Sequence, residues 1–128
     1  QELFTEYLKQ TISIRDTFVA KDRKENFYHG ILLGLLSSEE DWLIQSNPEA
    51  GDGYCDIRIE MDDTTGCIIE VKYAENRVYD EACAEALAQI DRMNYVEELT
   101  AGGLSCVYKY AVACYKKGCQ VVCEKVKQ

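Results

Sequence analysis

The chain has 128 residues, which is enough for one domain with a single core and too few for two. Apolar residues make up 47% and charged residues 29%, which excludes a disordered or collagen-like chain and is typical of a globular domain. Acidic residues outnumber basic residues by 23 to 14, a net charge of −9, so the composition alone provides no basic footprint for a nucleic acid.

The first part of the chain predicts two helices and three strands. Residues 2–10 favour a short helix, and we interpret residues 1–21 as a lead-in helix or the remnant of an upstream domain. Residues 22–37 repeat apolar side chains every three or four positions, which predicts a long amphipathic helix. Strands are then expected at 42–47, 54–61 and 67–73, and a polar turn joins the last two.

The second part predicts one long helix and a hairpin. Residues 79–100 carry a buried stripe that includes Met93, and two glycines, Gly102 and Gly103, end this helix. Residues 104–115 and 119–126 then read as two strands. We therefore predict that residues 22–128 form one α/β domain, a mixed sheet of about five strands flanked by helices.

The cysteines and the apolar runs bear on the cellular location of the protein. Seven cysteines are odd in number and lie mostly inside apolar segments, so we expect free, buried thiols rather than disulfides or a zinc site. The longest apolar run, residues 31–36, is too short to span a bilayer, and no secretory signal opens the chain. We expect a cytoplasmic protein without a membrane partner. Because the chain opens at Gln1 and not at Met, we also expect a domain of a longer protein.

Charged residues interrupt the predicted hairpin at positions where Val or Ile would pack better. The turn between the two strands predicts a register in which Asp56 lies opposite Lys72 and Arg58 lies opposite Glu70. Glu70 is then the diagonal neighbour of Asp56, roughly 7–8 Å away, within reach of one small cation between the two carboxylates. The other interpretation is a pair of crossed ion pairs on a solvated face of the sheet.

Several segments carry a resemblance to a known family. Gly53-x-x-Asp56 followed by Glu70-Val71-Lys72 resembles the Asp…Glu-x-Lys signature of the PD-(D/E)XK nuclease superfamily. The ordered segments ENFYHGILLGLL, SNPEAGDGYCDI, IIEVKY, EALAQIDRMNY and YKYAVACYKKGCQVV more closely resemble the nuclease-like domain found C-terminal to AAA-ATPase-like domains in bacterial proteins. The resemblance covers about residues 22–123 and implies a restriction-endonuclease-like fold. It also implies metal-dependent hydrolysis of phosphodiester bonds in DNA, and an N-terminal ATPase domain in the full-length protein.

The same resemblance assigns roles to the hairpin residues. It implies that Asp56 and Glu70 hold Mg²⁺ with the backbone carbonyl of Val71, and that Lys72 orients or deprotonates the attacking water. Oxygen ligands of this kind suit Mg²⁺ or Mn²⁺.

Two helical residues also match positions of the family's site. Glu25 matches a helix acid that reaches the metal, and Asp22 with Glu25 fits a capping box equally well. Gln89 is an amide among apolar positions of the second long helix, which favours a functional amide near the metal over a polar residue at the rim of the stripe. The spacing from Gln89 to Tyr95 exceeds that of the Gln-x-x-x-Tyr pattern of recombination-type relatives, so Tyr95 is not carried over.

Three further residues lie near the predicted site. Glu49, before the glycine turn, is either a solvated turn acid or an acid that binds or supports the metal. His29 is the single histidine, and we expect it to be structural, supporting the site through a pair with Glu25 four residues earlier. Tyr54 stands where relatives commonly carry a basic residue, which removes a phosphate contact.

The net charge leaves two functions open. A domain at −9 repels a polyanion except where basic residues cluster, so we expect it to bind nucleic acid weakly alone and to rely on a neighbouring domain. The chain offers two candidate clusters of basic residues: Lys21, Arg23 and Lys24, and Lys109, Lys116 and Lys117. The first function is a metal-dependent nuclease. The second is a catalytically silent regulatory or docking domain, whose acidic surface binds a protein such as its own ATPase partner.

Overall fold

Ten helices and strands follow one another along the chain in the computed structural model, which describes residues 1–11, 21–46, 55–93 and 95–126. In chain order they are α1 (Glu2–Thr11), α2 (Lys21–Leu36), β1 (Leu43–Ser46), β2 (Cys55–Glu60), β3 (Thr65–Tyr73), the 3₁₀ helix η2 (Glu75–Arg77), α3 (Tyr79–Arg92), α4 (Tyr95–Ala101), β4 (Cys106–Tyr115) and β5 (Gly118–Lys125).

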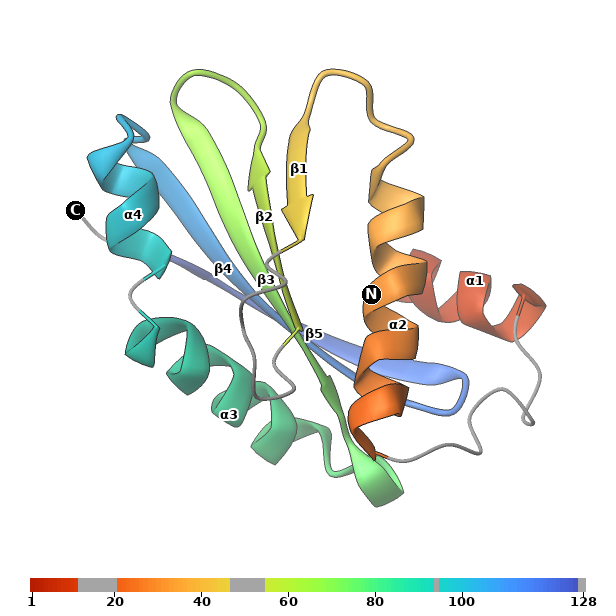
Figure 1. Cartoon of the computed structure of the whole chain (residues 1–128). Helices are drawn as coiled ribbons and strands as arrows, with labels where there is room; N and C mark the ends of the chain where they lie inside the picture. Colours follow the sequence, from red (N-terminus) through yellow and green to blue (C-terminus); the bar gives the residue numbers. More distant parts are fainter. Residues whose placement is uncertain (12–20, 47–54, 94, 127–128) are drawn as a thin grey trace.

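The strands form one five-stranded sheet in the order β1-β2-β3-β4-β5 (Figure 1). β3 and β4 are parallel and every other neighbouring pair is antiparallel. The parallel pair requires a long crossover, which η2, α3 and α4 provide. The predicted α/β fold with a mixed sheet of about five strands is confirmed.

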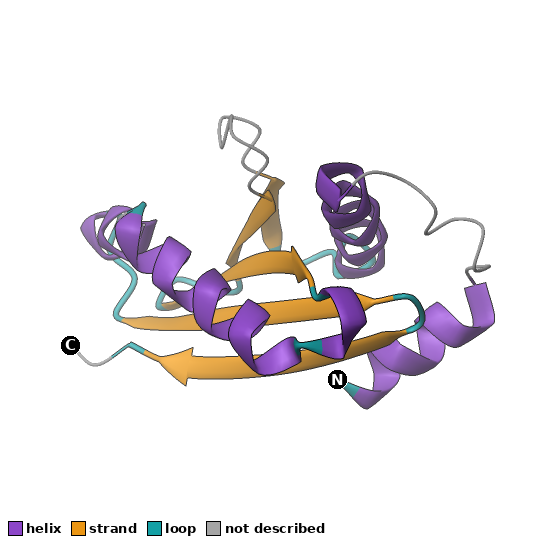
Figure 2. Cartoon of the chain, turned by 90° about the horizontal axis from the view of Figure 1, so that it is seen from below, coloured by secondary structure: helices purple, strands orange, loops and turns teal. Residues whose placement is uncertain are grey.

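Helices cover both faces of the sheet, as the views in Figures 1 and 2 show. Alternate residues of β3 explain this arrangement, because successive side chains of a strand point to opposite faces. Val71 packs in a core with Leu8 of α1 and Tyr28 of α2. Ile68 packs in a core with Ile90 of α3 and with residues of α4 and β4. β3 is therefore buried on both faces, and the charged residues on it lie inside the protein.

The predicted helix at 79–100 is wrong in one respect, because it is two helices. α3 ends at Arg92 and α4 begins at Tyr95, and Met93 between them is exposed rather than part of the buried stripe. The break lets α4 turn so that Leu99 packs in the core with Ile68. As predicted, glycines end this helical region: Gly103 adopts a φ of 102°, a left-handed conformation that favours glycine after a helix.

The hairpin of β2 and β3 has a register that differs by two residues from the predicted one. Asp56 faces Glu70, and Arg58 faces Ile68. The cause is the tight turn after β2, in which Asp62 Oδ1 accepts hydrogen bonds from the backbone N–H groups of Thr64 and Thr65, at 2.8 and 2.7 Å. These bonds lower the pKa of Asp62. They also bring Thr65 into the ladder, where its carbonyl accepts from the N–H of Met61 at 2.9 Å.

Most of the cysteines whose side chains the structure describes are free and buried, as predicted. Six cysteines are free there, and four of them, Cys67, Cys83, Cys114 and Cys119, are buried. Burial raises the pKa of Cys67 to about 12, so this thiol stays protonated and packs as a small apolar group. Across the described residues, no helix has both the length and the apolar character needed to cross a membrane.

Candidate active site

The candidate site begins with the direct pairing of Asp56 and Glu70 across β2 and β3. The carbonyl of Thr65 on β3 accepts a hydrogen bond from Met61 on the β2 side, and peptide groups alternate in direction along a strand. Glu70 lies five residues after Thr65, so its own N–H and C=O groups point the other way, toward β4. Asp56 and Glu70 form a non-hydrogen-bonded pair, the kind in which the two Cα atoms are only about 4.5 Å apart. The side chain of Asp56 lies outside the described part of the structure.

The backbone of Val71 has the opposite direction. By the same alternation its carbonyl points to the β2 side, where its register partner is Cys55, the first residue of β2. A carbonyl oxygen has two lone pairs, so it can accept a ladder hydrogen bond and still bind a cation. This direction is consistent with the role that the resemblance gives to Val71.

Glu70 and Lys72 are buried side by side on one face of β3. Glu70 is 0% exposed and Lys72 is 5% exposed. The interpretation of crossed ion pairs on a solvated face is therefore wrong for this hairpin. Burying a charged group carries an effective penalty of several kcal/mol unless partners compensate for it. Replacing a whole set of buried charged groups by apolar residues of similar volume is often neutral or stabilising, so packing alone does not require a carboxylate and an ammonium at these positions.

Gln89 of α3 binds the amine of Lys72 by a hydrogen bond. Lys72 Nζ donates a hydrogen bond of 2.6 Å to Gln89 Oε1, and Gln89 is 1% exposed. Gln89 is thus a buried partner of the predicted site and does not lie at the rim of the apolar stripe. Its amide nitrogen has no hydrogen-bond partner within the described residues.

Glu85 is a site residue that the sequence did not reveal. Its carboxylate lies 3.7 Å from Lys72 Nζ, and its side chain is exposed. Glu85 stands one helical turn before Gln89, so both reach Lys72 from the same face of α3. The i, i+4 spacing from Gln89 was the available signal, although an exposed helical glutamate is common enough to hide it.

Glu25 is buried near the start of α2. The preceding residue, Lys24, donates a hydrogen bond of 3.3 Å to the Tyr73 hydroxyl, and its ammonium lies 4.5 Å from the centre of that ring. The first turns of α2 thus contact β3 one residue beyond Lys72. Because α2 already begins at Lys21, Asp22 lies inside the helix and not at the cap position that the capping box requires.

His29 does not have the partner predicted for it. Its Nε2 is hydrogen-bonded to the hydroxyl of Ser46 on β1 at 2.8 Å, instead of pairing with Glu25. Burial lowers the pKa of His29, so the ring is neutral at pH 7. This contact ties α2 to the edge of the sheet, a structural role. Glu49 and Tyr54 lie outside the described residues, as does the side chain of Tyr95.

One of the predicted basic clusters is divided in the fold. Lys109 donates a hydrogen bond of 2.9 Å to Asp91 and lies 3.3 Å from Glu124. Desolvation lowers the pKa of Lys109, but its bonds to these two acids outweigh that effect and the net pKa is raised. Lys109 is therefore paired with two acids, whereas Lys116 and Lys117 remain on the turn between β4 and β5.

One of three comparisons with known proteins identifies the family of this chain. A family model described as the PD-(D/E)XK nuclease superfamily matches residues 23–124. The chain belongs to this superfamily, as the resemblance predicted, and the superfamily is typically metal-dependent. Searches of curated proteins and of solved structures found no match.

The donor set fits the metal ion that the superfamily uses. Glu70, the Val71 carbonyl and the register partner Asp56 are all oxygen donors, the type that Mg²⁺ and Mn²⁺ prefer. Among the described side chains alone, no three acidic, histidine or cysteine groups gather closely enough to bind a metal, and that set does not include Asp56.

Proposed function

We propose that this domain is a metal-dependent nuclease that hydrolyses phosphodiester bonds in DNA. The observation that carries the proposal is the burial of Glu70 and Lys72, side by side on β3, with Asp56 as the direct register partner of Glu70. A fold that needed only packing could use matched apolar residues at these positions with little or no loss of stability. Superfamily membership supports the same chemistry.

Each residue has a proposed role. Asp56, Glu70 and the Val71 carbonyl would hold Mg²⁺ or Mn²⁺, which when bound supplies Lewis-acid stabilisation of charge and a nucleophile at neutral pH. Lys72 donates an N–H group that orients the attacking water or stabilises charge that develops on the phosphate. Gln89 fixes the position of this amine through the 2.6 Å hydrogen bond.

We propose that two further acids, Glu25 and Glu49, belong to the metal site. Glu25 is buried on α2, which packs against the face of β3 opposite to Glu70, and we propose that it supports the metal from there. We propose Glu49, which lies outside the described residues, as a further acid of the site.

Substrate affinity is proposed to come from more than this domain. The net charge of −9 opposes binding of a polyanion, and Lys109 is already paired with two acids. We therefore propose that a neighbouring ATPase-like domain of a longer, cytoplasmic protein supplies most of the grip on DNA.

The same charge supports a second candidate function. An acidic surface is suited to binding a basic protein surface, so the domain could act as a catalytically silent docking module for its ATPase partner. In that case Glu70 and Lys72 would have no catalytic role.

A cleavage assay with matched variants separates the two candidates. We expect the wild-type protein to nick supercoiled plasmid with Mg²⁺ or Mn²⁺, and expect Asp56→Ala, Glu70→Gln and Lys72→Met each to lose at least about 100-fold of the rate. Lys125→Met removes an exposed lysine of β5 and should cut like the wild type. A single-stranded RNA substrate, run in parallel, tests the choice of DNA. Cleavage that survives in all three site variants would contradict the proposed site, and a wild type without cleavage or metal binding would favour docking.

A further inference from the structure

A hollow of about 490 Å³ lies between α1, η2, the start of α3 and the turn that joins β4 to β5. Its lining includes four basic residues, Lys9, Arg77, Lys116 and Lys117. They come from three segments that are far apart in the sequence. The volume is within the usual range of small-molecule pockets, about 300–1,000 Å³.

The charge around this hollow is opposite to the charge of the whole chain. Four of the 14 basic residues line it, and no acidic residue does among the described residues of its lining, in a chain with a net charge of −9. The nearest acids of α1, Glu2 and Glu6, line the adjoining hollow instead. Glu6 pairs with Lys9 at 3.7 Å, but both side chains are exposed, and such pairs contribute only about 0–1 kcal/mol. The charged side chains that line the hollow are therefore all basic among the described residues.

The backbone that carries these cations is fixed in an unfavourable conformation. Arg77 and Lys116 have φ values of 64° and 51°, in the left-handed region that non-glycine residues rarely adopt. The buried Tyr28 donates a hydrogen bond of 2.5 Å to the carbonyl of Lys116 and holds the turn in place. Strained residues of this kind typically cost about 1–3 kcal/mol each and cluster at functional sites.

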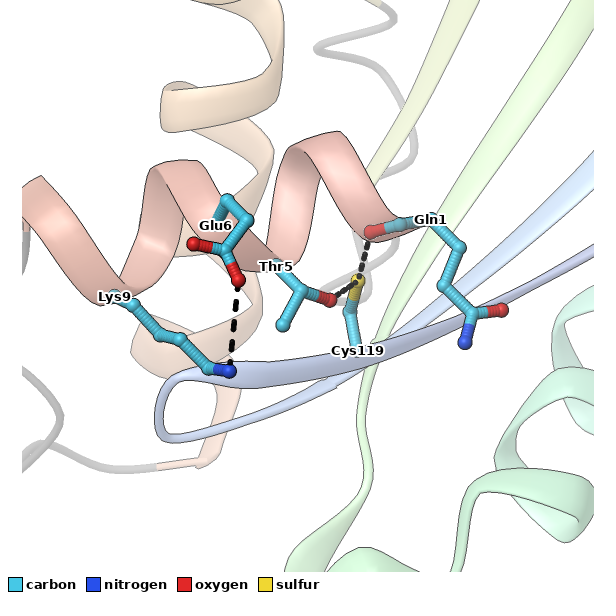
Figure 3. A network of polar contacts seen from close by, with 5 residues as sticks. All are labelled: Gln1, Thr5, Glu6, Lys9 and Cys119. Carbon is cyan, nitrogen blue, oxygen red and sulfur yellow. Dashed lines mark hydrogen bonds and ion pairs between the residues drawn. The ribbon is translucent and has the colours of Figure 1, made fainter.

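Helix α1 forms one wall of the hollow and is anchored to β5. Phe4 and Leu8 of α1 are buried in the main core. Thr5 Oγ1 lies 3.2 Å from Cys119 Sγ, which also donates to the carbonyl of Gln1, as Figure 3 shows. Lys9 extends from the same helix toward the hairpin (Figure 3). Helix α1 precedes the segment 23–124 that matches the superfamily.

We propose that this pocket binds a phosphate group that carries two or more negative charges. Lysine is a compact positive charge and arginine offers a planar fork of donors, and both are the usual ligands of phosphate. Four cations around one hollow exceed what a backbone phosphodiester, with one charge, can neutralise. The shared chemistry is that of a terminal phosphate on a nucleic-acid strand or of the polyphosphate of a nucleotide.

The pocket lies at the end of β4, a short way along this strand from the level of Glu70. Tyr115, where the turn begins, is four residues beyond Ala111, the β4 partner of Glu70, which is roughly 13 Å along the strand. A nucleic-acid strand at Glu70 is therefore long enough to reach the pocket within a few phosphates, at about 3.4 Å of axis each. Binding of phosphate in this pocket does not require cleavage at Glu70.

Binding measurements without divalent metal test the proposal, because cleavage then cannot interfere. The probes are inorganic pyrophosphate, ATP, and a single-stranded oligonucleotide with either a 5′-phosphate or a 5′-hydroxyl group. The wild type should bind at least one of the phosphorylated probes, more weakly as salt rises. Tighter binding of the 5′-phosphate than of the 5′-hydroxyl strand identifies a strand end, and binding of ATP or pyrophosphate alone identifies a nucleotide.

Variants link the binding to the pocket. Arg77→Asn with Lys116→Asn removes two charges and keeps residues that tolerate the left-handed backbone, and it should weaken binding about tenfold or more. Arg92→Gln with Lys125→Gln removes two exposed charges at the far ends of α3 and β5 and should change binding less than about twofold. If the first pair does not fold, Lys9→Gln with Lys117→Gln makes the same test. Equal losses in both pairs, or no binding of any phosphorylated probe at millimolar concentration, would overturn the proposal.

Discussion

The buried contact between Lys72 and Gln89 makes a quantitative prediction about stability. Gln89→Leu removes the acceptor of a charged hydrogen bond, and such bonds contribute about 1.5–3 kcal/mol. Lys72→Met leaves the buried oxygen of Gln89 without its donor, a loss of about 1–3 kcal/mol. Each change should therefore lower the free energy of unfolding by about 2 kcal/mol, and Tm by roughly 8 °C for a chain of this length.

The double variant distinguishes a buried pair from two independent residues. Met and Leu together fill the site with apolar groups, and replacing a buried polar pair in this way is often neutral. We expect the double variant to be more stable than the sum of the single effects allows, by about 1.5–3 kcal/mol. Urea unfolding under reducing conditions, followed by fluorescence of the single tryptophan, Trp42, gives all four free energies.

A matched pair elsewhere in the protein provides the control. Gln120 Nε2 donates to Asp80 Oδ1 at 2.8 Å at an exposed position, so Gln120→Leu and Asp80→Ala should couple by less than about 0.5 kcal/mol. If the Lys72 and Gln89 effects are additive to within the same limit, these side chains do not share a buried contact, and our view of Gln89 as the residue that positions the amine is refuted.

Three further predictions concern other parts of the fold. In Gly66→Ala the new Cβ would lie 2.7 Å from Leu104 Cδ1 and 3.0 Å from the carbonyl oxygen of Ile59, so calorimetry should show a Tm lower by roughly 4–11 °C, and an unchanged Tm would contradict this packing. Gly103→Ala forces alanine to a φ of 102° and should lower the unfolding free energy by about 1 kcal/mol, whereas no loss would mean that this helix end is not left-handed. Burial lowers the pKa of His29 below 6.5, so the folded state binds fewer protons than the unfolded state and stability should fall as the pH drops below 6.5. His29→Gln should remove this part of the pH dependence in urea unfolding at pH 5–7, and an identical slope in both proteins would exclude His29 as its source.

The sequence predicted most of the fold because its strands and helices have clear periods and clear ends. The long helix at 79–100 was an error because its apolar stripe continues through Met93, and only tertiary packing of Leu99 on Ile68 explains the break. The hairpin register was an error because the side chain of Asp62 shortens the turn through its own hydrogen bonds. The alternation of residues along a strand does not show that a side chain will bond to the backbone of the turn, so it could not predict this register.

The candidate site was predictable in part for the same reasons. Gln89 was conspicuous as an amide in an apolar stripe, and the fold brings it to Lys72. Glu85 had no such signal, because an exposed glutamate on a helix is ordinary. The basic pocket could not be predicted, since it joins residues of α1, η2 and the last turn, and only the folded sheet brings these segments together.

Titration calorimetry with Mn²⁺ tests most directly whether the buried carboxylate of Glu70 is a metal ligand. We predict that the wild type binds Mn²⁺ at millimolar concentration or below, and that Glu70→Gln, which keeps the shape of the side chain, loses this binding while Glu81→Gln, at an exposed position of α3, retains it. Equal Mn²⁺ affinity in the wild type and in Glu70→Gln would contradict the account.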